Sequence, residues 1–96
     1  MNTLIVYEEV PETTKFYLFP QGVLSKADMQ MLYACNEHFQ NGTDSEVAQE
    51  ALDRLGKQLY NDEGEDGPWA KYRVEAHAIA QPGQQIDRVF FTGFIL

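Results

Sequence analysis

The acidic side chains after residue 60 are the clearest chemical feature of the sequence. The segment YNDEGEDGPW, residues 60–69, ends at the only tryptophan, Trp69. Its four acids are Asp62, Glu63, Glu65 and Asp66. Carboxylates at this density can bind a hard cation or a basic surface. The segment lacks the alternating acids, sixth-position glycine and twelfth-position glutamate of an EF-hand, so we expect no metal here.

Cys35 and His38 are the other candidate reactive pair. They lie three positions apart on a predicted helix, where a histidine can activate a thiol. However, Cys35 shares an apolar stripe with Leu32 and Phe39, and buried cysteines usually act as small hydrophobic residues. The chain has no phosphate-binding or dinucleotide-binding glycine motif. We therefore expect no catalysis and no cofactor, and a small thiol enzyme that uses Cys35 and His38 remains an alternative.

The acidic charge is concentrated in one third of the chain. Residues 37–66 contain nine acids and two bases, which is −7 of the total −8. Three acids of the second predicted helix, Glu46, Glu50 and Asp53, lie at i, i+4 and i+7. This spacing separates carboxylates by about 5–6 Å along the helix, comparable with the roughly 3.4 Å phosphate spacing of one DNA strand.

The acids of the second predicted helix also have a structural explanation that needs no partner. Glu46 stabilises a helix N-terminus, and Glu50 and Asp53 can pair with the bases four residues later, Arg54 and Lys57. The acids of residues 62–66 have no such explanation, because negative charge after a helix C-terminus opposes the helix dipole. We therefore predict that a partner binds these loop acids, with Trp69 beside them and the three helix acids above. A solvated turn and a core tryptophan are the alternatives.

Composition restricts the class of protein. A chain of 96 residues with 44% hydrophobic residues forms one compact domain, residues 1–96. A net charge of −8 opposes direct binding to nucleic acid or anionic lipid and favours a basic protein surface. The N-terminus MNTLIVYEEV reaches two acids before a signal-peptide core could form, and one cysteine makes no internal disulfide. We expect a cytoplasmic protein.

Hydrophobic periodicity predicts four strands and two helices. The first helix spans about residues 26–40 with Ser25 as N-cap and Gly42 after its end, and Thr43 with Glu46 forms a capping box for the second. The predicted strands are residues 3–10, 15–19, 69–79 and 86–96. The order ββααββ with short connections predicts an α+β two-layer sandwich, in which a four-stranded antiparallel sheet carries both helices on one face.

The last predicted strand has apolar residues on both faces. Phe90 and Phe94 alternate with Val89, Phe91 and Ile95. A central strand of the monomer explains this pattern best, and a strand covered by a second copy is the alternative.

These observations favour a non-enzymatic binding protein whose acidic surface occupies the nucleic-acid groove of a partner. Phage and mobile-element inhibitors, including anti-restriction and anti-CRISPR proteins, share this size and charge, which is an analogy without a motif. The alternative function is a homodimeric structural or regulatory domain that associates through its C-terminal strand.

Overall fold

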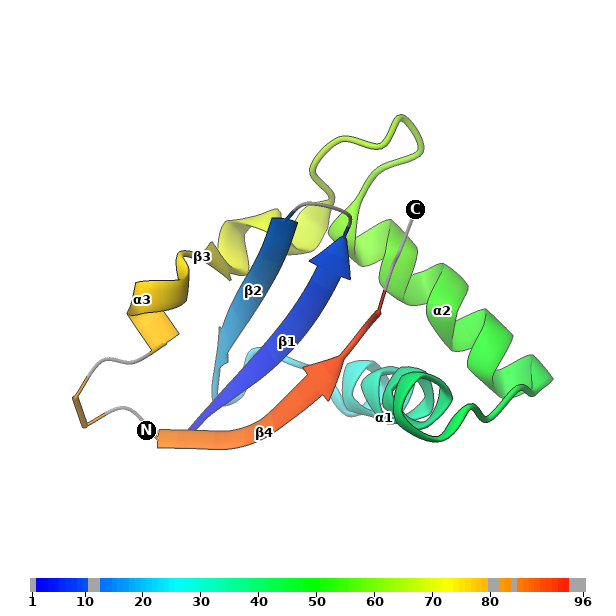
Figure 1. The fold of residues 1–96 in the computed structure, drawn as a ribbon, viewed down its shortest axis with the longest axis horizontal. Coiled ribbons are helices and arrows are strands. Elements are labelled where there is room, and N and C mark those ends of the chain that lie inside the picture. Colours follow the sequence, from blue (N-terminus) through cyan, green and yellow to red (C-terminus); the bar gives the residue numbers. More distant parts are fainter. Residues whose placement is uncertain (1, 11–12, 80–81, 84, 94–96) are drawn as a thin grey trace.

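The computed structural model describes residues 2–10, 13–79, 82–83 and 85–93 (Figure 1). The elements in chain order are β1 (Asn2–Val10), β2 (Thr13–Pro20), α1 (Lys26–Asn41), α2 (Glu46–Leu59), the 3-10 helix η1 (Pro68–Tyr72), β3 (Arg73–Val74), α3 (Ala76–Ile79) and β4 (Gln85–Phe91). The α+β class agrees with the sequence prediction. None of the described helices is both long and apolar enough to span a membrane.

Capping residues set the ends of the two long helices. Ser25 accepts a hydrogen bond from the backbone N–H of Asp28, and the Asp28 carboxylate accepts one from the backbone of Ser25, which confirms Ser25 as the N-cap and adds a capping box. Gly42 ends α1 in the left-handed conformation with φ of 70°. The predicted cap of α2 is wrong. Ser45, and not Thr43, accepts the hydrogen bond from the backbone of Ala48 at 3.1 Å.

The predicted antiparallel ββααββ sheet is also wrong. The strand order is β3-β2-β1-β4, so the last two strands lie at opposite edges. β1 pairs antiparallel with β2, but β4 pairs parallel with β1. The third strand contains only Arg73 and Val74. A short turn before the last strand predicted a hairpin, whereas the chain crosses to the far side of β1 before β4 begins.

Residues 69–79 were predicted as one strand because small or apolar residues alternate with polar ones. Most of this segment is instead helical, in η1 and α3. Pro68 occupies the first turn of η1, a position that proline favours. Alanine at positions 70, 76 and 78 prefers helix over strand. The alternation therefore reflected two short helices, of which η1 contributes Trp69 to the core.

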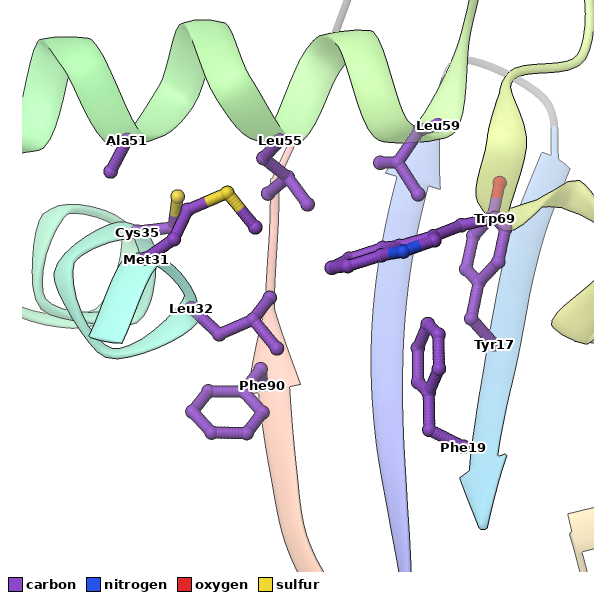
Figure 2. Packing of buried hydrophobic residues seen from close by; sticks show 10 residues of the cluster. All are labelled: Tyr17, Phe19, Met31, Leu32, Cys35, Ala51, Leu55, Leu59, Trp69 and Phe90. Carbon is purple, nitrogen blue, oxygen red and sulfur yellow. The ribbon is translucent and has the colours of Figure 1, made fainter. Parts of the chain in front are cut away.

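The core lies between the helices and one face of the sheet (Figure 2). Tyr17 and Phe19 enter it from β2, and Phe90 enters from β4. The helices contribute Met31, Leu32, Cys35, Ala51, Leu55 and Leu59, and η1 contributes Trp69. The apolar stripes predicted for both helices are mostly buried; Val47 is the exception, because its side chain is 67% exposed.

The last strand is not central among the described strands. β4 lies at the edge beside β1, and three of its apolar side chains are 39–41% exposed: Ile86, Val89 and Phe91. The predicted positions Phe94, Ile95 and Leu96 lie outside the described residues. The prediction of a central strand failed because it assumed that two apolar faces are both buried within one monomer.

Candidate acidic interface

The acidic loop after α2 is closed by its own backbone. Tyr60 and Asp66 form an antiparallel bridge, and the N–H of Asn61 donates to the carbonyl of Glu65 at 2.8 Å. The N–H of Gly67 donates to the carbonyl of Leu59 at 3.0 Å, so the loop returns to the end of α2. The acids are therefore carried on a short hairpin and not on an extended connection.

The Asn61 side chain fixes the tip of this hairpin. Its Oδ1 accepts hydrogen bonds from the backbone N–H groups of Glu63 and Glu65, both at 2.9 Å. Gly64 has φ of 78°, a left-handed conformation that suits glycine. An asparagine that bonds to the backbone two and four residues later orders a turn without help from a partner.

Gly67 allows the hairpin to lie against the end of α2. A Cβ atom at this position would lie 2.7 Å from the carbonyl oxygen of Gln58 and 2.8 Å from the backbone nitrogen of Tyr60. Backbone atoms cannot move aside as a flexible side chain can. The close approach thus requires glycine here.

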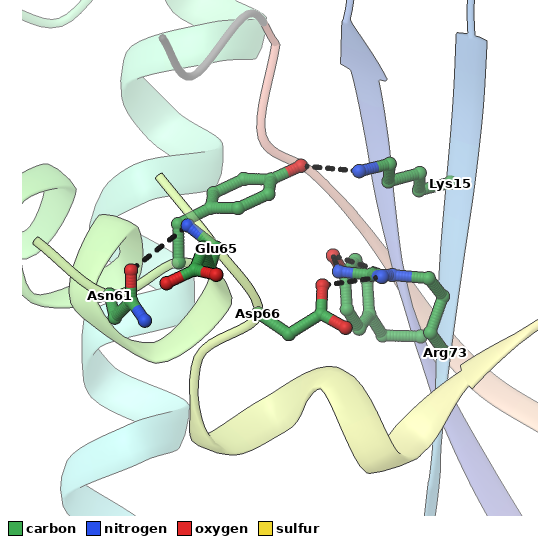
Figure 3. A network of polar contacts seen from close by, with 7 residues as sticks. Lys15, Asn61, Glu65, Asp66 and Arg73 are labelled. Atoms are coloured by element: carbon green, nitrogen blue, oxygen red, sulfur yellow. Dashed lines mark hydrogen bonds and ion pairs between the residues drawn. The ribbon is translucent and has the colours of Figure 1, made fainter. Parts of the chain in front are cut away.

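Arg73 connects the base of the hairpin to the sheet (Figure 3). Its Nη1 lies 2.9 Å from Oδ1 of Asp66, while Nε and Nη2 donate to the Tyr17 hydroxyl at 3.3 and 3.1 Å. Burial lowers the pKa of Arg73, but the hydrogen bonds with Tyr17 and Asp66 outweigh it and raise this pKa above its ordinary value. Nearby, Lys15 donates to the Tyr60 hydroxyl at 2.9 Å.

These contacts change the interpretation of the four loop acids. Asp66 has a structural partner in Arg73, contrary to the expectation that none of the four has one. Asp62, Glu63 and Glu65 are exposed, and their carboxylates have no ion pair or hydrogen bond with any described residue. The hairpin therefore presents three unpaired carboxylates on an ordered backbone.

The three helix acids are also exposed and unpaired within the described chain. Glu46, Glu50 and Asp53 lie on the outer side of α2. The expected pairs of Glu50 with Arg54 and of Asp53 with Lys57 are absent, since neither pair lies within 4.0 Å. The end of α2 leads directly into the hairpin, so both sets of acids lie on consecutive elements of the chain (Figure 1).

Trp69 lies beneath the hairpin and not on this surface. Its side chain is 7% exposed, and its ring contacts Phe19 edge-on with centroids 4.9 Å apart. Leu59 lies on its other side (Figure 2). The tryptophan alternative given above, a core residue, describes this position, although it sits in η1 and does not start a strand.

Cys35 and His38 do not form a reactive pair in the described structure. Cys35 is 1% exposed, and burial raises the pKa of its thiol to about 11, which disfavours the thiolate. Nδ1 of His38 bonds instead to the carbonyl of Thr43 at 2.9 Å. Among the described residues, no three His, Cys, Asp or Glu side chains are grouped so that they could hold a metal ion.

Sequence reasoning missed the residues that support the hairpin. Asn61, Gly64 and Gly67 were visible as turn formers, and an asparagine two positions before Glu63 is a recognisable turn signal. Arg73 and Tyr17 gave no signal, because 56 residues separate them.

Comparisons with protein-family models, curated proteins and solved structures find no match to this chain.

Proposed function

We propose that this protein is a non-enzymatic inhibitor that binds a basic, nucleic-acid-binding surface of another protein. We name the residues that would make this contact the acidic surface: Glu46, Glu50, Asp53, Asp62, Glu63 and Glu65. The observation that supports the proposal is that these six carboxylates are exposed and have no base as a partner within the described chain.

Unpaired carboxylates on ordered backbone are suited to binding. An ordered hairpin loses little conformational entropy when it binds, so more of the interaction energy remains as affinity. Three charges within four positions of the hairpin repel one another, a cost that a basic partner would relieve. A loop that needs only solubility does not require this arrangement.

The charges favour a partner that normally binds phosphates. A groove lined by lysine and arginine binds DNA largely through contacts with closely spaced phosphates. The carboxylates of α2 repeat at about 5–6 Å along the helix axis, so one groove could accept several of them. The net charge of −8 would attract such a partner and repel nucleic acid itself. The setting we propose is cytoplasmic.

The first experiment is capture of partners from a lysate by the tagged protein, followed by mass spectrometry. Low-salt capture should enrich nucleic-acid-binding proteins, and their recovery should fall as salt increases because exposed charges are screened. The test variant is D62N/E63Q, which leaves Asp66 paired with Arg73. We expect it to weaken capture by about tenfold or more.

A matched control removes the same charges elsewhere. E75Q/D87N also replaces one glutamate and one aspartate, and both residues are exposed outside the acidic surface. It should capture the same proteins as the unmodified chain. Equal loss in both variants would show that only total charge matters, and unchanged capture by D62N/E63Q would rule out the hairpin as the contact.

A further inference from the structure

β4 is the longer of the two edge strands of the sheet. Among the described strands, β3 and β4 lie at the two ends of the order β3-β2-β1-β4, and β3 has two residues whereas β4 has seven. β4 contains no proline, and its apolar side chains Ile86, Val89 and Phe91 are 39–41% exposed. The outer backbone groups of such a strand can pair with a strand of another molecule, and a second copy of this chain carries the same strand.

The backbone of β4 points alternately toward β1 and toward the outer edge. The N–H of Phe91 donates to Oδ1 of Asn36 in α1 at 3.2 Å, so it faces away from β1. Successive residues of a strand direct their N–H and C=O groups to opposite sides, and Val89 therefore faces outward as well. Phe91 and Val89 are thus the positions at which an added strand would bond, and Asn36 already occupies one of them.

Two further contacts hold α1 against this edge. Tyr33, three positions before Asn36 and on the same side of the helix, meets the Phe90 ring edge-on with centroids 5.4 Å apart. The Arg88 guanidinium lies 4.8 Å from the centre of the Tyr33 ring. Figure 1 shows α1 at the β4 edge of the sheet, on the side away from β1. The position of Asn36 is therefore fixed by its neighbours on both elements.

The first half of β4 is irregular. The register with β1 skips Asp87 between Thr3 and Leu4, so this charged residue has no partner in the ladder. Bulges and charged residues interrupt the regular pairing of edge strands. Addition of a regular strand is thus restricted to the residues after Asp87, which include Phe91.

We propose that α1 closes the outer edge of β4 to strand addition, with Asn36 as the residue that occupies the edge backbone. The contact keeps this edge of the chain monomeric. A dimer through the C-terminal strand, the alternative function predicted from the sequence, would require Asn36 to release Phe91. The closed edge is independent of the inhibitor function proposed above, because neither residue belongs to the acidic surface.

Sedimentation equilibrium from about 1 µM to 1 mM, at high salt to screen the net charge, compares N36A with N41A. Both variants replace an asparagine of α1 without a change of charge, and Asn41 bonds to Glu37 and not to the sheet. We expect the unmodified chain and N41A to remain monomeric. N36A should self-associate at least about tenfold more strongly, because two backbone N–H groups per dimer become available.

A second substitution shows whether this association uses β4. Proline at Val89 removes an outward-facing N–H and leaves the ladder with β1 intact, so N36A/V89P should be monomeric again. N36D keeps a hydrogen-bond acceptor at the same place and should behave as the unmodified chain does. Association of N36A that V89P does not reverse would overturn the proposal.

Hydrogen exchange of the Phe91 amide measures the contact itself in dilute, monomeric protein. Exchange should be at least about tenfold faster in N36A than in N41A, because the N–H loses its acceptor. Equal exchange in the two variants would overturn the proposal, as would N36A that is monomeric up to 1 mM or an unmodified chain that associates as strongly as N36A. If circular dichroism shows that N36A does not fold, N36S takes its place, since the serine hydroxyl is one bond too short to reach Phe91.

Discussion

Arg73 connects the acidic hairpin to the sheet through two different side chains. Its guanidinium bonds to Asp66 of the hairpin and to the Tyr17 hydroxyl in the core, and its own side chain is 26% exposed. Hydrogen bonds to charged groups stabilise a fold by about 1.5–3 kcal/mol, and partial exposure reduces this value. Arg73 thus holds the base of the hairpin against the sheet.

We predict that R73Q lowers the free energy of unfolding by about 1–2 kcal/mol. The control is K57Q, which removes one positive charge at an exposed residue with no ion pair in the described chain. Urea denaturation followed by circular dichroism measures both. A loss no greater than that of K57Q would mean that the Arg73 contacts contribute nothing to stability.

Cys35 makes the stability of the fold depend on pH in the alkaline range. Burial raises the pKa of its thiol from 9.0 to about 11, so the unfolded chain loses this proton first as pH rises. The contribution of the buried, protonated thiol to the free energy of unfolding is complete below pH 9 and is lost as pH increases toward 11. Its upper limit is about 2–3 kcal/mol.

The measurement compares the unmodified chain with C35A at several pH values between 8 and about 11. Other groups titrate in this range, so the difference between the two proteins isolates the thiol. The difference in unfolding free energy should shrink as pH rises. A constant difference would show that the thiol pKa is not raised by burial.

At the scale of single elements, α2 provides a direct test of capping. Ser45 accepts from the backbone N–H of Ala48, while Thr43 lies two residues earlier outside the helix. We predict that S45A costs about 1 kcal/mol of stability and that T43A costs less than half of this. Thermal denaturation of both variants tests the assignment, and the reverse order would restore the Thr43 cap predicted from the sequence.

Local signals predicted the helices well, because caps and apolar stripes involve residues a few positions apart. Ser25 and Gly42 predicted the two ends of α1 from the sequence alone. The alternation in residues 69–79 was ambiguous, since its alanines and lysine suit short helices as well as a strand. The parallel pairing of β4 with β1 depends on contacts across more than 80 residues, and no local pattern encodes it.

For the acidic surface, too, the sequence predicted local features but not long-range contacts. The sequence indicated where carboxylates gather, and α2 places three of them on an exposed side. It could not show that Asp66 pairs with Arg73 or that Trp69 is buried beside Phe19. Both facts depend on how η1 packs between α2 and β2.

At the scale of the whole molecule, the acids are concentrated in one part of the chain. Nine of the fifteen acids fall in residues 37–66, and this segment carries −7 of the total charge of −8. A basic partner is therefore attracted mainly to this segment, which includes α2 and the hairpin.

Competition between this protein and duplex DNA for the purified, captured partner tests the central proposal most directly. Binding of the chain to the partner is measured by fluorescence anisotropy at increasing DNA concentrations. Charge mimicry predicts that the apparent dissociation constant rises in proportion to DNA, and that D62N/E63Q is displaced by about tenfold less DNA than E75Q/D87N. A ternary complex in which partner, DNA and this protein are bound together would contradict it.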